Sequence, residues 1–198
     1  TDQAGMPYFD HPLRVMQAVQ AQGAQPYVQM AAILHDVTED SKFTCQMLLD
    51  LGVSEAAVEI VKLLDRDYSM YLYVSTHEAR SYDDIPKNER MLQIGEGCYS
   101  MEDVDAFYYE NIRNNPGALI VKDADITDNL KEYRLSYLSE NRQKHLRKKY
   151  HKARIALGLV NNYLIPGEYE KDLGFSDQLI RIDEQWPQIK LSNYLSAT

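Results

Sequence analysis

The sequence predicts an all-α fold, and three observations lead to this prediction. Apolar residues recur at helical steps of three and four along most of the 198 residues. Glycine and proline stand where such segments end or begin, as at Gly23 and Pro26. Alternation typical of a β-strand is scarce, and residues 71–75 form the only short β-prone run. Because 44% of the residues are hydrophobic, a chain of this length can bury one sizeable core, and we expect a single domain over residues 1–198.

The first third of the chain is expected to form a series of helices. Asp10 is a plausible N-cap for a first helix that ends at Gly23. Pro26 suits the first turn of a second, buried helix. Thr44 and Ser54 are each placed to cap a further helix, the second of which carries an apolar stripe at three-residue steps.

The middle of the chain has a different character. Residues 66–103 are rich in polar residues, glycine and tyrosine and have weak periodicity, so we expect a long irregular excursion from the helical bundle. Helical periodicity returns over 104–114, continues over 118–138 and predicts a long helix over 141–164. Residues 166–198 are interpreted as a C-terminal extension.

Composition narrows the possible partners. Lys and Arg number 21 and Asp and Glu number 30, which gives a net charge of −9. Duplex DNA and anionic membranes both attract basic surfaces, so neither is expected as a partner. The two cysteines lack the spacing of a disulfide framework or a thiolate metal cluster and fit a reducing compartment. We therefore expect a cytoplasmic protein that binds a small molecule, with its oligomeric state undetermined.

One short segment concentrates ionisable groups after an apolar run. His35 and Asp36 are adjacent, and Glu39 and Asp40 follow one helical turn later. Four such groups are costly to desolvate unless a cation compensates them. A divalent cation would hold His35 and Asp36 in their deprotonated forms and acidify bound water. Glu39 and Asp40 would then suit general acid and base catalysis.

Two other segments can complete a metal site. His11 lies at the start of the first helix, and Asp125 interrupts an apolar helical stretch, with Asp128 and Asn129 on its face. Two imidazoles and two carboxylates without sulfur suit Mn²⁺, Fe²⁺ or Mg²⁺ at least as well as Zn²⁺. Histidines elsewhere lack ligand-like spacing to these segments, so one metal ion is expected.

Each residue taken alone also has a structural interpretation. A His-Asp dipeptide is common by chance, and Glu39 with Asp40 could form an exposed helix end. His11 could be a hydrogen-bonded histidine, and Asp125 could be a solvated helix carboxylate. These alternatives remain open when the segments are considered one at a time.

Taken together, the segments resemble the HD-domain phosphohydrolases, specifically the RelA/SpoT-type branch that includes the small stand-alone metazoan SpoT homologues. The branch typically has G-x-P-Y-x-x-H-P, then A-x-L-L-H-D-x-x-E-D-T, then V-K-x-A-D-x-x-x-N-L. The corresponding segments here are GMPYFDHP at 5–12, AAILHDVTEDS at 31–41 and VKDADITDNL at 121–130.

The resemblance implies an HD-domain helical bundle with a defined chemistry. It implies one Mn²⁺ bound by His11, His35, Asp36 and Asp125. Glu39 and Asp40 would activate or position the attacking water, and Asn129 would lie near the sugar. The implied reaction is the release of pyrophosphate from the 3′ position of guanosine tetra- or pentaphosphate.

The residues expected to bind substrate are Asn129, Lys122, Asp128 and Arg147. Lys122 and Asp128 belong to the segment that contains Asp125, so they are expected near the implied metal. Arg147 belongs to a helix that carries seven basic residues, which either receives polyphosphate or is a solvated face. The family often has a basic residue where Ile126 stands, and an Arg before the first motif where residues 1–4 are acidic. Two alternatives therefore remain: a phosphohydrolase of another nucleotide, such as a dNTP or the 2′-phosphate of NADPH, and a non-catalytic nucleotide-sensing domain.

Overall fold

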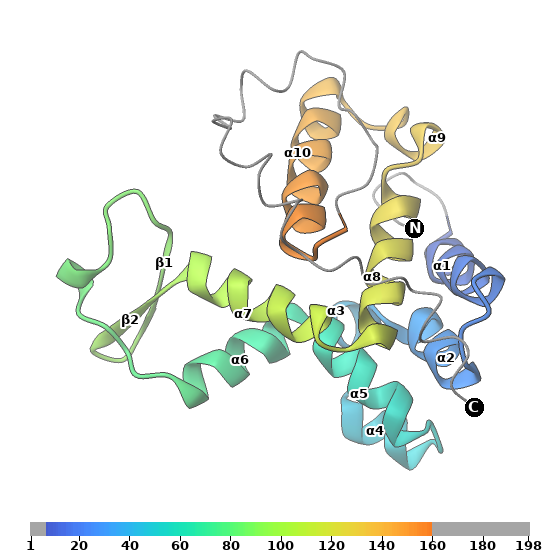
Figure 1. Ribbon diagram of the computed structural model, residues 1–198, viewed down its shortest axis with the longest axis horizontal. Coiled ribbons are helices and arrows are strands. Elements are labelled where there is room, and N and C mark those ends of the chain that lie inside the picture. The colour runs from blue at the N-terminus through green and yellow to red at the C-terminus, as the bar shows by residue number, and fades with distance from the viewer. Residues whose placement is uncertain (1–6, 160–198) are drawn as a thin grey trace.

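The computed structural model describes residues 7–159, most of which are helical. Figure 1 shows the arrangement of the elements. In chain order they are α1 (Asp10–Ala21), α2 (Pro26–Leu34), α3 (Val37–Asp40), α4 (Cys45–Asp50), α5 (Glu55–Leu64), α6 (Arg66–Thr76), the 3₁₀ turn η1 (Tyr82–Asp84), β1 (Met91–Ile94), β2 (Gly97–Ser100), α7 (Met101–Arg113), α8 (Pro116–Asn129), α9 (Glu132–Leu135) and α10 (Glu140–Ala156). The all-α prediction is confirmed.

Local capping explains where several of these helices begin. The Thr44 hydroxyl accepts from the Met47 N–H and the Ser54 hydroxyl from the Ala57 N–H, as the sequence predicts. Asp10 is instead the first residue of α1, and no side chain caps this helix. Its acidic side chain lies in the first turn, where it interacts favourably with the positive end of the helix dipole.

The core lies where α8 meets the helices around it. This helix packs against α1, α2, α5 and α7, and in Figure 1 it crosses the middle of the molecule. Val15, Ala31, Val61 and Val121 contribute side chains with no exposed surface. Because these residues come from four helices, burying them fixes the relative positions of α1, α2, α5 and α8.

The prediction of an irregular excursion over residues 66–103 is correct only in part, because residues 77–90 contain just a short 3₁₀ turn but the flanking segments are regular. Residues 66–76 form α6, and β1 pairs with β2 in an antiparallel hairpin at the far end of α6 and α7 (Figure 1). Asp65 caps α6 by accepting from the Tyr68 N–H. The aromatic run that suggested a strand is helical because Tyr73 packs on Phe107 of α7 and Tyr99 of β2, with ring centroids 5.4 and 5.9 Å away.

Two helices end earlier than predicted. The segment expected to be helical to residue 138 stops at Asn129, and the short helix α9 follows after a bend. Helix α10 ends at Ala156, with Gly158 in the left-handed conformation (φ 71°). The rest of the helix predicted to reach residue 164, and the C-terminal extension, lie outside the described residues. Among residues 7–159 no helix combines the length and apolar character needed to cross a bilayer.

Candidate metal centre and its cavity

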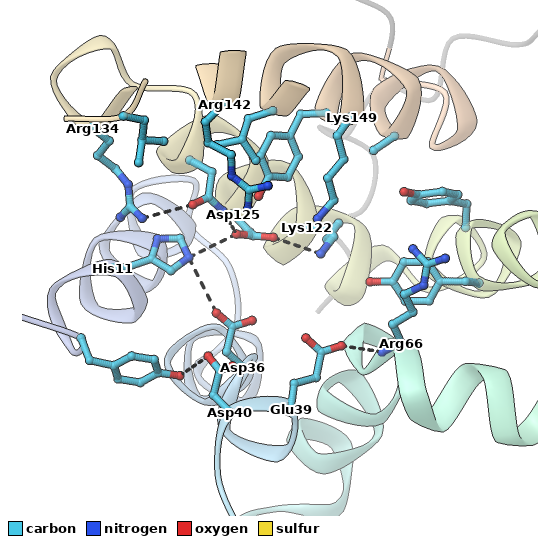
Figure 2. A pocket seen from close by; sticks show the side chains of 18 residues that line it. His11, Asp36, Glu39, Asp40, Arg66, Lys122, Asp125, Arg134, Arg142 and Lys149 are labelled. Carbon is cyan, nitrogen blue, oxygen red and sulfur yellow. Dashed lines mark hydrogen bonds and ion pairs between the residues drawn. The ribbon is translucent and has the colours of Figure 1, made fainter. Parts of the chain in front are cut away.

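The four predicted metal ligands converge from three parts of the core. His11 lies in the first turn of α1, His35 and Asp36 join α2 to α3, and Asp125 lies in α8. Donor atoms of His11, His35 and Asp36 all lie within 4.8 Å of one another. Asp125 Oδ1 is 3.2 Å from His11 Nε2 and 3.8 Å from His35 Nε2. Figure 2 shows His11, Asp36 and Asp125 facing one another.

The hydrogen bond of His35 determines which of its nitrogens can bind a metal. Nδ1 lies 2.8 Å from the carbonyl oxygen of Ala32, which only accepts, so Nδ1 carries the donating proton. In the neutral ring, Nε2 therefore has a lone pair. This buried atom has no hydrogen-bond partner among the described residues, although Asp36 Oδ2 lies 3.1 Å away. A nitrogen lone pair and carboxylate oxygens repel each other unless a cation lies between them, so this arrangement favours a bound cation.

His11 has the same arrangement. Its Nδ1 lies 2.8 Å from Asp128 Oδ2, while Nε2 faces Asp125 Oδ1 and, at 3.9 Å, Asp36 Oδ2. If Nδ1 donates to Asp128, the Nε2 lone pair points at the same group of oxygens as that of His35. The Nε2 atoms of both imidazoles thus face the same position, which is the candidate position of the metal ion.

The electrostatics of the cluster also fit a cation. Burial lowers the pKa of His35, but the carboxyls of Asp125 and Asp36 outweigh it and raise the pKa to about 10. Burial raises the pKa of Asp125, but Lys122, His11 and His35 hold it well below the usual range. The cluster therefore attracts positive charge, which a divalent ion supplies when both histidines are neutral. Two imidazoles and two carboxylates fit a divalent metal of hard-to-borderline character.

A cavity of about 580 Å³ opens beside the predicted ligands. Glu39 and Asp40 line it, and each is oriented by a neighbour. The backbone N–H of Arg66 donates to Glu39 Oε1 at 2.7 Å, and the Tyr8 hydroxyl donates to Asp40 Oδ2 at 2.8 Å (Figure 2). Burial in the cavity raises the pKa of Glu39, although the Arg66 N–H opposes this. A carboxyl with a raised pKa suits proton transfer near neutral pH.

Basic side chains line the same cavity. Lys122 contacts Asp125 Oδ2 at 3.0 Å, and Arg66 pairs with Asp105 of α7. In Figure 2 Arg142 and Lys149 extend from α10, across the cavity from Asp36, Glu39 and Asp40. Among the described residues, the lysines and arginines that line the cavity are Arg66, Lys122, Arg134, Arg142 and Lys149. A cavity with a cation-binding cluster on one side and ammonium and guanidinium groups on the other suits a polyanion.

The predicted substrate residues fall in two groups. Lys122 and Asn129 line the cavity, and Asn129 Nδ2 donates to Asp125 Oδ1 at 2.6 Å. Asp128 and Arg147 are not among the residues that line it. Asp128 is 3% exposed and lies behind His11. Arg147 pairs with Glu132 at 2.9 Å, because it lies on a different face of α10 from Lys149.

The sequence does not predict several of the residues that line the cavity. Tyr8 belongs to the first motif but has no predicted role there, and Arg66 lies outside all three motifs. Arg142 and Lys149 are predicted only as members of a basic helix. For α10 the sequence periodicity could have indicated which residues share a helix face, because the lining positions follow helical spacing. These positions are 142, 146, 149, 150 and 153. For Arg66 the N-cap at Asp65 was the available indication that a helix begins beside Glu39.

Comparison with known proteins identifies the fold. The HD domain family model matches residues 8–130, which include all four predicted ligands together with Glu39 and Asp40. The chain belongs to the HD-domain family. HD domains bind divalent metals, and this HD protein is a metal-dependent phosphohydrolase, in keeping with the ligand cluster and the cavity.

A solved structure of a metazoan protein agrees with this assignment at the level of the fold. A metazoan SpoT orthologue, described as hydrolysing ppGpp and having a role in starvation responses, is 18% identical with a TM-score of 0.51, over 92% of this chain and 84% of that one. A protein of Listeria monocytogenes EGD-e is 21% identical with a TM-score of 0.47, over 96% of this chain and 98% of that one. The search of curated proteins found no match.

Proposed function

We propose that this HD-domain protein is a guanosine 3′,5′-bis(diphosphate) 3′-pyrophosphohydrolase that uses one Mn²⁺ held by His11, His35, Asp36 and Asp125. The observation that carries the proposal is the cavity, which joins the cluster of candidate ligands to five lysine and arginine side chains within residues 7–159. Its volume of about 580 Å³ is in the range of sites for nucleotide-sized ligands. The activity described for the metazoan SpoT orthologue supports this choice of nucleotide.

The bound cation would act as a Lewis acid that withdraws charge from the phosphoryl group and acidifies water. Glu39 would then accept the proton of the attacking water. Arg66 N–H holds Glu39 Oε1, which leaves Oε2 available for that proton. Asp40, oriented by Tyr8, would hold the water in line with the phosphorus. Water attack at the 3′-diphosphate yields pyrophosphate and GDP.

The basic residues would hold the charged ends of the substrate. Lys122 lies next to the metal centre, where it would neutralise the 3′-diphosphate. Arg142 and Lys149 lie across the cavity, where they would bind the 5′-diphosphate. Asn129 is oriented by its bond to Asp125 and would contact the sugar.

A second candidate is hydrolysis of another nucleotide, such as a dNTP or the 2′-phosphate of NADPH. It is favoured by Ile126, which stands where the RelA/SpoT-type branch often has a basic residue. The Ile126 side chain has no exposed surface, so this position makes no substrate contact. The phosphate contacts must then come from basic residues of α6, α8, α9 and α10, which other nucleotides could also use.

A nucleotide panel with Mn²⁺ tests the proposal. Products are separated by ion-exchange chromatography, so that release of pyrophosphate, phosphate and triphosphate is distinguished. We expect pyrophosphate and GDP from guanosine tetraphosphate, and no turnover after chelation of the metal. Release of phosphate from NADPH or of triphosphate from a dNTP, with guanosine tetraphosphate left intact, would replace the first candidate by the second.

A further inference from the structure

Asp128 lies outside the cavity but touches a metal ligand. It belongs to the last turn of α8, is 3% exposed, and its Oδ2 is 2.8 Å from His11 Nδ1. We propose that Asp128 is a positioning residue that keeps the proton of His11 on Nδ1, so that Nε2 presents its lone pair to the metal. The inference rests on the metal centre of the proposed function and is independent of which nucleotide is hydrolysed.

Three basic side chains hold the Asp128 carboxylate in place. Arg14 donates through Nε to Oδ1 at 2.8 Å and through Nη2 to Oδ2 at 3.0 Å. Lys131 Nζ lies 2.9 Å from Oδ1, and Arg134 Nη1 donates to Oδ2 at 2.9 Å. These partners come from α1, from the bend after α8 and from α9. Because both oxygens are held by positive donors, the carboxylate faces His11 as an ionised acceptor, and His11 Nδ1 must be the donor.

The same network reaches a second metal ligand. Arg134 Nη2 donates to Asn129 Oδ1 at 3.2 Å, and Asn129 Nδ2 donates to Asp125 Oδ1 at 2.6 Å. The path from His11 through Asp128, Arg134 and Asn129 therefore ends on Asp125. Asp125 Oδ1 lies 3.2 Å from His11 Nε2, which closes a ring of contacts. Rotation of the His11 imidazole would break this closed path of contacts. The network therefore fixes the direction of His11 Nε2 as well as the tautomer of the imidazole.

An amide cannot replace this carboxylate without conflict. In Asp128→Asn, an oxygen turned toward His11 leaves the NH₂ group against Arg14 and Lys131, which are donors. An NH₂ group turned toward His11 makes Nδ1 an acceptor and moves the proton to Nε2, where it blocks metal binding. Both orientations weaken the metal centre, although the volume of the side chain is almost unchanged.

The experiment compares Asp128→Asn with Asp123→Asn in the 198-residue chain. Asp123 is also in α8 and pairs with Arg154 at 3.6 Å, but it does not line the cavity and does not touch a predicted ligand. Dissociation constants for Mn²⁺ and Zn²⁺ are measured by calorimetry, with circular dichroism as the check of folding. We expect Asp128→Asn to bind metal about 10- to 100-fold more weakly and Asp123→Asn to match the wild type. Equal affinity in Asp128→Asn and the wild type would overturn the proposal.

A measurement on the wild type decides the question if Asp128→Asn does not fold. Long-range ¹H–¹⁵N spectra of the Zn²⁺-loaded protein report the state of each imidazole nitrogen. We expect His11 to carry a proton on Nδ1 and the metal on Nε2. Metal on Nδ1, or an Nδ1 without a proton, contradicts the inference. Neither experiment uses a nucleotide, so failure of the proposed pyrophosphohydrolase activity would be seen separately.

Discussion

The two sides of the cavity are built in different ways. On the metal side, His11, His35 and Asp125 are at most 7% exposed. They lie in α1, directly after α2 and in α8, three helices that pack together in the core. On the basic side, Arg142 and Lys149 extend from α10 with exposed side chains. Core packing can hold the donor atoms of short side chains at the precise positions that a metal ion needs. Long exposed side chains supply charge, but packing fixes their positions less closely.

This difference separates the expected roles of the two sides. The metal side should determine the rate of the chemical step, because a small displacement of a ligand changes the coordination geometry. The basic side should mainly determine how tightly the substrate is held, because it neutralises charge that is present before and during the reaction. Substitutions on each side can test this separation.

The largest effect is expected from His35→Gln. This substitution removes the buried nitrogen of a proposed metal ligand, whose proton is placed on Nδ1 by the Ala32 carbonyl. A catalytic metal supplies several kcal/mol of transition-state stabilisation, so we expect kcat to fall by about 10³-fold or more. The matched control is His145→Gln, because His145 is exposed on α10 and does not line the cavity. Metal content is measured by mass spectrometry alongside kcat, and retention of both by His35→Gln would show that the cluster is not the metal centre.

A smaller effect, with a distinctive pH dependence, is expected from Glu39→Gln. Burial raises the pKa of Glu39 above the usual 4.5, and Glu39 is active as a base only when ionised. The wild-type rate should therefore rise with pH through this raised pKa and level off above it. Loss of a general base costs about 10²-fold or more, so Glu39→Gln should be slow and should lack this acidic limb. The measurement is kcat from about pH 4 to about pH 8, and an unchanged acidic limb would assign the titration to another group.

The sequence could single out candidate ligands for the metal side because much of the information is local. His35 and Asp36 are neighbours, and Asp125 stands out as a carboxylate in an apolar helix. Joining them to His11 required the resemblance to a family, since no local pattern shows that α1 packs against α8. The position of Asp128 shows the limit of this reasoning. Helical spacing places Asp128 on the Asp125 face, but the approach of α1 puts it behind His11 and outside the cavity.

The remaining features depend on long-range packing. Residues 71–75 are helical because Tyr73 meets Phe107, which lies 34 positions later in the chain. Similarly, helical spacing shows that Arg142 and Lys149 share a face of α10, but only the packing of α10 against α7 decides that this face meets the cavity. Neither contact can be predicted from local helix or strand propensity.

The smallest effect is expected on the basic side, from Lys149→Ala. A charge-assisted hydrogen bond contributes about 1.5–3 kcal/mol, so we expect KM to rise by about tenfold or more, with kcat nearly unchanged. Lys152→Ala is the matched control, because Lys152 is exposed on the same helix and does not line the cavity. It removes the same charge from α10 without removing a cavity contact.

The two lysine variants also distinguish a contact from a long-range field. If Lys149 touches the phosphate, the ratio of KM between Lys149→Ala and Lys152→Ala should persist when salt is raised. If α10 acts only through its summed charge, the two variants should raise KM equally, and salt should remove both effects because it screens exposed charges beyond about 10 Å. The second result would mean that the basic side attracts the substrate without binding it at a defined position. Recognition of the nucleotide would then depend on Lys122 and Asn129, next to the metal centre.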